Sequence, residues 1–353
     1  MNVLGLDIGG ANIKLADPDG NTLSRAFPMW TRHSELAEEL MTLTQSFAMP
    51  DLIGLTMTGE LADCFLNRED GVSQIIGSVE QAFPSTVIRV WMSSGEFTEP
   101  ETARQLTDLV AAANWLAQAT WTARAFPNGP AILVDMGSTT TDVIPLQGGV
   151  AVPSGRTDLQ RLASGELIYA GASRTPLCAV LPAVTVEGSS IPTAAEFFAT
   201  TADVFLLHGL IPEDAANCNT ADGRPLTVEH SQRRLAKMIC CDSTDFSDDQ
   251  LCTIASEFVA SIRGQLHDSI VRVSQTVMSD DSDESLGLII SGSASQLLDH
   301  LLQDAPLTQP VTQINLSRTA SPGIADCACA YAVACLAHDL CRDDLLPFSN
   351  LVR

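Results

Sequence analysis

Two short segments, each built around an Asp and a Gly, constrain the fold of this chain more than any other feature. The first covers residues 6–14 (LDIGGANIK) and the second covers residues 134–142 (VDMGSTTTD). Each follows a short apolar run that is typical of a buried strand, and each continues into another strand-like run. The sequence therefore predicts a strand, a tight glycine turn and a second strand at both places.

Such a turn is suited to binding phosphate. An Asp at the end of a strand, beside glycines that expose backbone N–H groups, can hold a metal ion against phosphate oxygens. We therefore expect Asp7 and Asp135 to be metal ligands. The expected phosphate contacts are Gly9, Gly10 and Asn12 in the first turn, and Gly137, Ser138, Thr139 and Thr140 in the second. Because the pattern occurs twice, we expect two related half-sites that face one another.

Each segment ends on a charged side chain. Side chains alternate along a strand, so Lys14 shares a face with Asn12 and can reach a site that contains Asp7. Lys14 is one of two lysines in the chain, and a solvated strand lysine is the alternative interpretation. Asp142 is a candidate base, a ligand of a metal-bound water or a cap. For the Thr-rich run before it, the alternative is a strand without a binding role.

Two further segments place polar groups directly after a strand. Residues 56–63 (TMTGELAD) carry Glu60, a candidate acid or base. The alternative is a helix N-terminus that carries favourable acidic residues. Residues 289–294 (IISGSA) predict a strand, a glycine turn and the start of a helix. Gly292 and Ser293 would bind an anion or a nucleotide-like group there, unless the turn is an ordinary α/β crossover.

Residues 165–176 (GELIYAGASRTP) surround two larger side chains, Tyr169 and Arg174, with small residues. Arg174 can clamp a phosphate or a carboxylate through its planar guanidinium group. We treat both side chains as candidate substrate contacts. A surface turn before Pro176 is the alternative.

The composition excludes several classes of function. The chain has 353 residues, of which 45% are apolar and 18% charged, which indicates a globular protein. Its formal charge of −24 repels nucleic acids and anionic membranes, so we expect neither as a partner. No apolar run approaches the ~20 residues that span a bilayer. The N-terminus lacks the basic flank of a signal peptide, so we expect a cytoplasmic protein.

The cysteines point to the same compartment. The chain contains ten of them, and none forms a C-x-x-C pair. We expect small buried thiols in a reducing environment rather than disulfides. Zinc binding is not expected, because the spacing of zinc ligands is absent.

Strand and helix signals alternate along the chain, which predicts an α/β fold with a mixed sheet in each of two domains. The turn at residues 127–130 (PNGP) predicts the boundary between a domain of residues 1–128 and a domain of residues 129–322. We expect an apolar helix at 323–340 that packs back on the first domain. Single helices are predicted at 101–119 and 248–278. An acidic, solvated loop is expected at 279–284.

Together these segments resemble the acetate and sugar kinase/Hsp70/actin superfamily. Residues 7–14 and 135–142 resemble its two phosphate loops, and residues 291–294 its adenosine-type loop. Residues 165–175 and 325–332 look like its connecting segments. The resemblance implies an α/β chain with two ribonuclease-H-like domains, of the actin and sugar kinase-type ATPase fold, around a central phosphate-binding cleft.

Within that superfamily the chain is similar to the hydantoinase/oxoprolinase branch. It resembles more closely a short family of tetrahydromethanopterin-linked C1-transfer pathway proteins. The similarity rests on residues 5–14, 56–61, 126–129 and 165–171. That family includes a synthase of methanofuran biosynthesis. The resemblance implies transfer of a furanylmethyl group from its diphosphate ester to the phenol of tyramine, tyrosine or a γ-glutamyl form. A homodimer is compatible with it.

Ala11 departs from many kinase relatives, which carry Thr or Ser after the first glycine pair. The missing hydroxyl weakens an ATP-hydrolysis interpretation more than a diphosphate-binding one, so ATP is not the favoured cofactor. We expect Asp7 and Asp135 to hold Mg²⁺, Lys14 to stabilise the leaving diphosphate, and Asp142 or Glu60 to accept the phenol proton. The alternatives are an ATP-dependent hydantoinase-like enzyme, a small-molecule kinase and a non-catalytic actin-like nucleotide switch.

Overall fold

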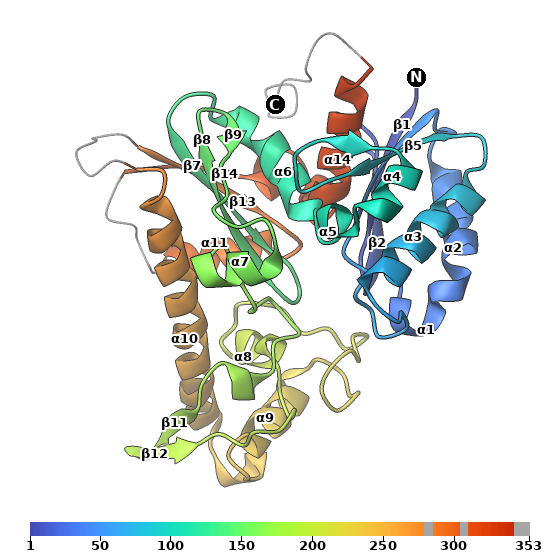
Figure 1. Cartoon of the computed structure of the whole chain (residues 1–353). Coiled ribbons are helices and arrows are strands. Elements are labelled where there is room, and N and C mark those ends of the chain that lie inside the picture. The colour runs from blue at the N-terminus through green and yellow to red at the C-terminus, as the bar shows by residue number, and fades with distance from the viewer. Residues whose placement is uncertain (279–284, 304–309, 342–353) are drawn as a thin grey trace.

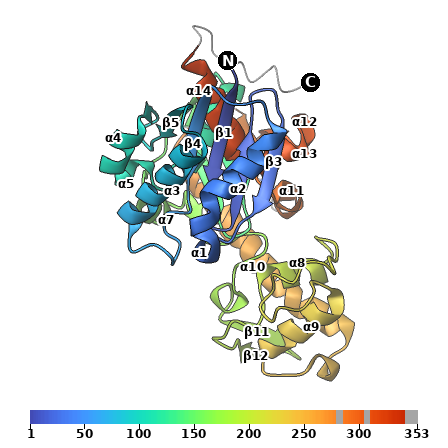
Figure 2. The same cartoon turned by 90° about the vertical axis from the view of Figure 1, so that its right-hand side faces the viewer.

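A computed structural model of the chain describes residues 1–278, 285–303 and 310–341. The acidic loop expected at 279–284 lies outside the described residues. Within them, two larger mixed sheets stand side by side with helices around them, and a smaller lobe extends from the second sheet (Figure 1 and Figure 2). The predicted α/β fold with two mixed sheets is confirmed. The domain boundaries stay a prediction.

The first sheet comes from the N-terminal part of the chain. Its strands are β1 (Val3–Ile8), β2 (Asn12–Ala16), β3 (Thr22–Ala26), β4 (Leu52–Met57), β5 (Val87–Trp91) and β6 (Phe97–Thr98). They lie in the order β3-β2-β1-β4-β5-β6, with β1 antiparallel to β2 and parallel to β4. Every residue of β1 and β4 is buried. Apolar side chains of α2 (Leu36–Leu43) and α3 (Arg68–Ala82) share one core with these strands.

The second sheet repeats this plan. Its strands are β7 (Pro130–Met136), β8 (Thr141–Gln147), β9 (Val150–Ala151), β10 (Leu167–Ile168), β13 (Leu286–Ser291) and β14 (Val311–Asn315). The order is β10-β8-β7-β13-β14, with β9 paired to β8. As in the first sheet, the central strand β7 pairs antiparallel with the next strand and parallel with a later one. Two helices, α10 (Asp248–Ser274) and α11 (Ser295–Gln303), pack on it in one core.

Two helices lie between the sheets. They are α6 (Asn114–Thr122) and α14 (Ala328–Asp339), and they contact each other in a core that also contains side chains of β7, β8 and β13. The small residues of α14 let it lie directly on β1 and β4. As expected, this C-terminal helix packs back against the first sheet (Figure 1).

The close approach of α14 predicts a large effect of one added methyl group. A Cβ at Gly5 on β1 would lie 2.0 Å from the carbonyl oxygen of Ala330 on α14. Gly5→Ala should therefore lower the free energy of unfolding by about 1–3 kcal/mol or more, because neither backbone can yield easily. The matched control is Gly77→Ala on α3, where an added Cβ meets no atom within 4 Å. That substitution should instead stabilise the helix by about 0.5–1 kcal/mol. Urea unfolding of both variants measures the contrast, and equal midpoints would contradict it.

The smaller lobe is attached to the second sheet through α10. It contains β11 (Ala183–Val186), β12 (Ser189–Pro192), α8 (Thr201–Leu207) and α9 (Val228–Lys237) (Figure 2). Its interior holds a fully buried ion pair between Arg234 and Asp203, 2.7 Å apart. Asp222 satisfies a second nitrogen of the same guanidinium group.

Two long predicted helices are interrupted. Residues 101–119 form α4 (Pro100–Gln105), α5 (Thr107–Val110) and α6 rather than one helix. The break at Ala111 arises because this residue bridges to Met57 at the end of β4, and Ala112 then adopts a φ of +47°. The C-terminal helix divides at Cys327 into α13 (Pro322–Asp326) and α14. The predicted helix over 248–278 ends at Ser274.

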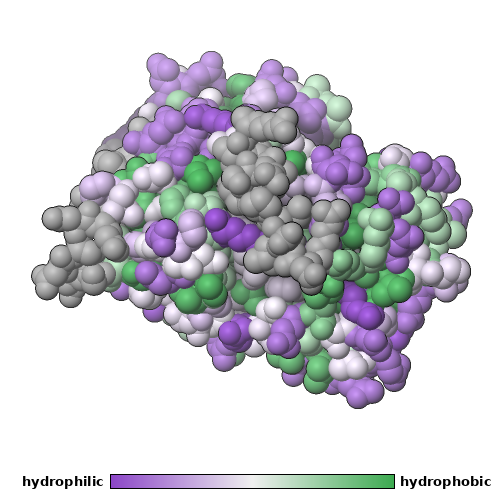
Figure 3. Space-filling model, turned by 90° about the horizontal axis from the view of Figure 1, so that it is seen from above, coloured by the Kyte–Doolittle hydropathy of each residue, from purple (hydrophilic) through white to green (hydrophobic). Residues whose placement is uncertain are grey.

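The remaining short helices are α1 (Met29–Arg32), α7 (Asp158–Ser164) and α12 (Leu316–Thr319). All ten cysteines are free thiols, but only Cys327 and Cys335 are buried, so the expectation of uniformly buried thiols was wrong. Hydrophilic residues are interspersed with smaller hydrophobic patches on the face shown in Figure 3. In the parts of the chain that the structure describes, no helix has the length and apolarity to cross a membrane.

Candidate active site at the two Asp–Gly turns

The two Asp–Gly turns have the same hydrogen-bonded geometry. In the first, Asp7 pairs with Lys14 across β1 and β2, and Gly9 N donates to Asn12 O at 2.9 Å. In the second, Asp135 pairs with Asp142 across β7 and β8, and Gly137 N donates to Thr140 O at 3.0 Å. The predicted strand, turn and strand are therefore present at both places, in one register.

A second glycine loop supports each turn. Asp7 lies beside Thr56 on β4, and Asp135 lies beside Ser291 on β13. After β4, a Cβ at Gly59 would come within 3.0 Å of the Gly9 carbonyl group. After β13, Gly292 has a φ of +96°, and a Cβ there would lie 2.3 Å from Met136 O. The strand, glycine turn and helix start predicted here are present, and the loop of Gly292 and Ser293 lies against the second turn.

The two aspartates come together in one electrostatic environment. Asp7 is 7% exposed, and burial raises its pKa from 3.8 to about 6. Lys14, its partner across β1 and β2, lowers this pKa and Asp135 raises it, so charges of both turns act on the Asp7 carboxylate. Burial also raises the pKa of Asp135, with Asp142 adding to the effect. Side chains from both sheets therefore converge on one site, as expected for two facing half-sites.

Lys14 is held by a residue that the sequence did not single out. Its Nζ donates to the backbone oxygen of Asp326 at the end of α13 and lies 3.3 Å from the Asp326 carboxylate. Burial alone would lower the pKa of Lys14, but Asp326 and then Asp7 more than offset it, and the pKa is raised. The lysine therefore stays charged beside Asp7.

Two amide side chains of α6 each interact with one of the aspartates. The sequence patterns did not indicate either of them. Gln118 Nε2 donates to Asp135 Oδ2 at 2.5 Å and to Ser291 Oγ at 2.6 Å. One turn earlier, Asn114 hydrogen-bonds to the Asp7 carboxylate and lowers its pKa. Residues four apart share a helix face, so the spacing of these amides within an Ala-rich helix was the signal that could have found them.

Gln118 should stabilise the half-buried Asp135 measurably. Gln118→Met keeps the length and volume of the side chain but removes the donor, so we expect a loss of about 1–3 kcal/mol in the free energy of unfolding. The control is Gln81→Met on the exposed face of α3, which should change it by less than about 0.5 kcal/mol. Urea unfolding at pH 8 compares the two, and equal effects would contradict a role for Gln118.

The segment around Arg174 lies directly on the second turn. Ala172 N donates to Gly137 O and Arg174 N to Ser138 O, each at 2.9 Å. A Cβ at Gly171 would lie 2.6 Å from the backbone of Ser138 and Thr139, so only glycine fits there. Arg174 therefore lies at the edge of the predicted phosphate loop.

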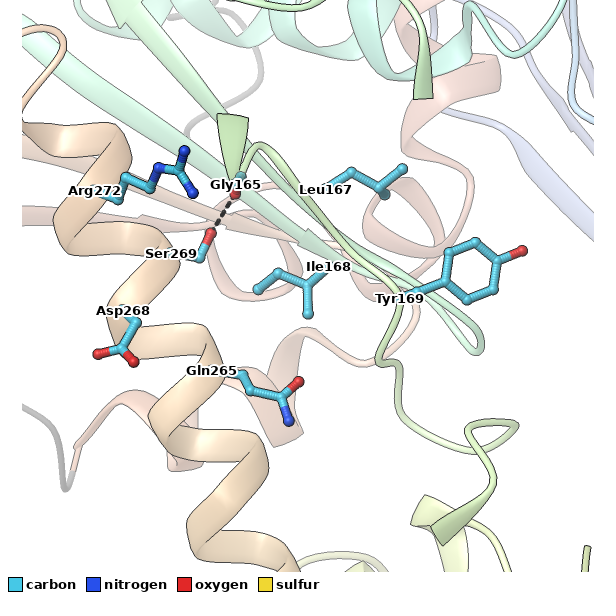
Figure 4. Close-up of a pocket in the computed structure, with 8 residues that line it drawn as sticks. All are labelled: Gly165, Leu167, Ile168, Tyr169, Gln265, Asp268, Ser269 and Arg272. Carbon is cyan, nitrogen blue, oxygen red and sulfur yellow. Dashed lines mark hydrogen bonds between the residues drawn. The ribbon is translucent and has the colours of Figure 1, made fainter. Parts of the chain in front are cut away.

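Tyr169, predicted to bind substrate with Arg174, lies elsewhere. It lines a cavity of about 370 Å³ between β10 and α10, together with Gln265, Asp268 and Arg272 (Figure 4). Tyr169 is 66% exposed, and β8 separates β10 from the strand that carries Asp135. The backbone of Arg174 bonds to Ser138 in the second turn, whereas the side chain of Tyr169 lines this separate cavity.

Asp142, one of two candidate bases, is already paired. Its Oδ1 lies 2.5 Å from Arg161 Nη2, and the Arg161 guanidinium stacks on the Trp115 ring at 4.0 Å. Arg161 is almost fully buried, and Asp142 is its nearest charge partner, with Asp158 farther away at 3.7 Å. Asp142 therefore has a structural role, because it neutralises a buried guanidinium group.

Glu60, the other candidate base, is buried without a charge partner in contact. It is 1% exposed, and among the described residues neither carboxylate oxygen has a hydrogen-bond partner of standard geometry. Burial raises its pKa from 4.5 to about 7, although backbone groups of Glu60 and Ala112 lower it somewhat. Ala112 is the residue at positive φ, and strained backbone of this kind is concentrated at functional sites. Glu60 therefore has the properties of a general base at neutral pH.

The site fits a metal ion that arrives with a phosphate. Within the described ranges, no group of three or more His, Cys, Asp or Glu side chains could hold a metal alone. Mg²⁺, however, is commonly bound by one or two carboxylates together with substrate phosphates and waters. Among the described residues, the buried Oδ1 of Asp7 has no hydrogen-bond partner of standard geometry, and the charge of Asp135 acts on the same carboxylate. These two carboxylates match the requirements of Mg²⁺.

Comparison with known proteins places this site in a family. Residues 51–338 match the sequence profile of the hydantoinase/oxoprolinase family. The chain belongs to this family. The resemblance to the hydantoinase/oxoprolinase branch, which short sequence motifs indicated, is confirmed.

Two relatives are named as one kind of synthase, whose product is a (γ-glutamylaminoethyl-phenoxymethyl)furanyl methanamine. The protein of Methanocaldococcus jannaschii is 33% identical over 305 residues, which cover 86% of this chain and 89% of the relative. The protein of Methanococcus vannielii is 38% identical over 144 residues, 41% of this chain and 64% of that relative. Among solved structures, the nucleotide-free acetone carboxylase matches with a TM-score of 0.50 and 13% identity. That match covers 92% of this chain and about half, 51%, of the carboxylase chain, and it supports the fold class.

Proposed function

We propose that this hydantoinase/oxoprolinase family member forms an aryl ether in the biosynthesis of a methanofuran-type cofactor. Its substrates would be an (aminomethyl)furanylmethyl diphosphate and the phenol of γ-glutamyltyramine or a related amine. The observation that carries the proposal is the pair of aspartates, Asp7 buried and Asp135 half-buried, at two turns of equal register. The names of the two relatives supply the identity of the product.

The proposed reaction breaks one C–O bond and forms another. The bond between the furanylmethyl carbon and the diphosphate breaks, and its electron pair leaves with the diphosphate. The furan ring delocalises positive charge that develops at the exocyclic carbon. The phenol oxygen then bonds to this carbon and releases its proton. Diphosphate is the second product, so no oxidant and no nucleotide are required.

The residues of the two turns suit the leaving group. Lys14 carries a positive charge beside Asp7, and the backbone N–H groups of Ser138 and Thr139 lie at the second turn, where the N–H of Gly137 already donates to Thr140 O. Preorganised charge and N–H donors stabilise an anion as it develops. Asp7 and Asp135 would hold Mg²⁺, which when bound neutralises charge on the diphosphate.

Glu60 is the proposed acceptor of the phenol proton. A base works best when its pKa is near the working pH, and burial brings that of Glu60 to about 7. Its loop lies on the first turn, where Thr58 N and Gly59 N both donate to Ile8 O at 3.0 Å. Asp142 is the weaker candidate because Arg161 already occupies its carboxylate.

The test supplies both substrates and Mg²⁺ to the purified chain without nucleotide. The expected result is one equivalent of ether product, identified by mass spectrometry, for each diphosphate released. Product that forms only with ATP, with stoichiometric ADP, would replace the proposal with an ATP-dependent reaction. Nucleotide binding without any turnover would instead indicate an actin-like switch.

A further inference from the structure

Trp30 differs from the other tryptophans of the chain in both exposure and position. Of the four, Trp91, Trp115 and Trp121 are at most 3% exposed, whereas Trp30 is 45% exposed. It lies on α1, whose first residue is held against the first Asp–Gly turn, because Met29 N donates to Gly10 O at 2.9 Å. A large aromatic face is therefore open to solvent at the edge of the candidate site.

Arg174 faces Trp30 from the other half of the chain. Its backbone is bonded to Ser138 in the second turn, and its guanidinium carbon lies 6.0 Å from the centre of the Trp30 ring. The buried pair of Arg161 and Trp115 is much tighter, at 4.0 Å. Among the described residues the Arg174 guanidinium has no carboxylate partner, in a chain whose formal charge is −24. The contact between Arg174 and Trp30 is therefore weak, and no carboxylate among the described residues neutralises the Arg174 charge.

The surroundings connect this pair to the proposed base. Loop 58–67, which carries Glu60, touches α1 and the turn after it in two places. Cys64 Sγ donates to Met29 O at 3.4 Å, and the rings of Phe65 and His33 meet edge to face with centres 5.8 Å apart. A ring held against Trp30 would therefore lie beside the loop of the general base and outside the two phosphate turns.

We propose that Trp30 and Arg174 form the binding site for the aromatic ring of the acceptor. The acceptor's phenol ring stacks on the indole, and the guanidinium lies over its electron-rich face, an arrangement that stabilises aromatic ligands. The donor is anchored by its diphosphate at the turns, so the acceptor has to approach from the solvent side, where these two side chains lie. This inference rests on the proposed function for the identity of the acceptor.

Fluorescence provides a binding test that does not depend on turnover. Because the other three indoles are buried, quenching by an added ligand reports mainly on Trp30. Tyramine alone should quench the wild-type emission saturably, and Trp30→Phe should abolish that signal. The matched ligand 2-cyclohexylethylamine has similar size and charge but no aromatic face, so it should bind at least about tenfold more weakly. Equal binding of both amines would overturn the proposal.

Kinetics separate acceptor binding from a contact that only joins the two halves. Trp30→Ala and Arg174→Ala should each raise KM for the phenol about tenfold and leave KM for the furanylmethyl diphosphate unchanged. Trp30→Phe should recover most of the loss. The control is Met49→Ala, a residue that is 68% exposed and lies beside Asn2 at the other end of β1.

The outcomes are distinguishable. A lower melting temperature with unchanged KM for the phenol would show that the pair only joins the halves of the molecule. Equal increases in both KM values would also overturn the proposal. If the wild-type protein makes no ether at all, the proposed function fails, while tyramine quenching still decides whether Trp30 binds a phenol.

Discussion

Asp7→Asn should lower kcat by about 10²–10³-fold and at the same time make the protein more stable at pH 8. The loss of activity follows because Asn cannot supply the anionic ligand that a cation on the diphosphate requires. The gain in stability follows from burial, which raises the pKa of Asp7 to about 6. An ionised carboxylate in that position costs free energy that a neutral amide does not.

The pH dependence of that gain has a definite sign. The folded-state pKa lies above the usual value of 3.8, so the folded protein favours the protonated acid. The cost is therefore absent below about pH 4 and grows until about pH 6, where it reaches roughly 3 kcal/mol. Urea unfolding without Mg²⁺ should show Asp7→Asn to be more stable than wild type at pH 8 and equal to it at pH 4.

The control for Asp7 is an exposed acid in the neighbouring β2–β3 hairpin. Asp19→Asn should change neither turnover nor the pH dependence of stability, because its carboxylate is solvated. Mg²⁺ provides a second comparison, since a ligand that binds the folded state raises its stability. Added together with diphosphate, Mg²⁺ should raise the melting temperature of wild type at pH 8 above the value with diphosphate alone, and it should add nothing for Asp7→Asn. Equal stabilisation of both proteins would exclude Asp7 as a metal ligand.

Glu60→Gln should reduce kcat/KM for ether formation by about 10²–10⁴-fold, the usual contribution of a general base. In wild type, kcat/KM should rise with pH and level off above about pH 7, where Glu60 is ionised. The variant should lack this rise. Initial rates between pH 5.5 and 8.5, at low concentrations of the phenol, measure both profiles.

Measurements of stability test the burial of the Glu60 charge independently of activity. Its folded-state pKa of about 7 exceeds the usual 4.5, so ionisation destabilises the fold by roughly 3 kcal/mol above pH 7 and not at all below about pH 4.5. Glu60→Gln should therefore match wild type at pH 4.5 and exceed its stability at pH 8. If the stability difference between Glu60→Gln and wild type is the same at pH 4.5 and at pH 8, Glu60 is not a buried charge.

Asp142→Asn is the informative comparison, because it should act in the opposite direction. Removing this carboxylate leaves the buried Arg161 guanidinium without its partner at 2.5 Å, so stability at pH 8 should fall by roughly 3 kcal/mol. If Asp142→Asn instead removed the rise of kcat/KM with pH, and Glu60→Gln kept it, the assignment of the base would be reversed.

These expectations share one physical cause. Asp7 and Glu60 are carboxylates in surroundings that disfavour their charge, and groups of this kind are concentrated at functional sites. Substitutions that remove the charge should gain stability and lose activity together. Asp142 and Arg161, in contrast, satisfy one another and so contribute to the folded state.

Local sequence patterns were sufficient for the elements of the site. Glycine turns after apolar runs predicted both strand, turn and strand units, since the residues involved lie within about ten positions of one another. The helix predicted at 101–119 failed for a non-local reason. Ala-rich composition favours a helix throughout, but Ala111 bridges to Met57, a residue of another element, and this contact ends α5.

The sequence by itself determined the two Asp–Gly turns, the family and the set of candidate polar residues. Only the tertiary structure decided which of them meet. Gln118 reaches Ser291 across 173 positions and Lys14 reaches Asp326 across 312, and side-chain periodicity indicates a face but never the distant group that lies against it. The difference between Glu60, which is buried alone, and Asp142, which is paired with Arg161, also arises only when the sheets pack, because burial and pairing are properties of the assembled core.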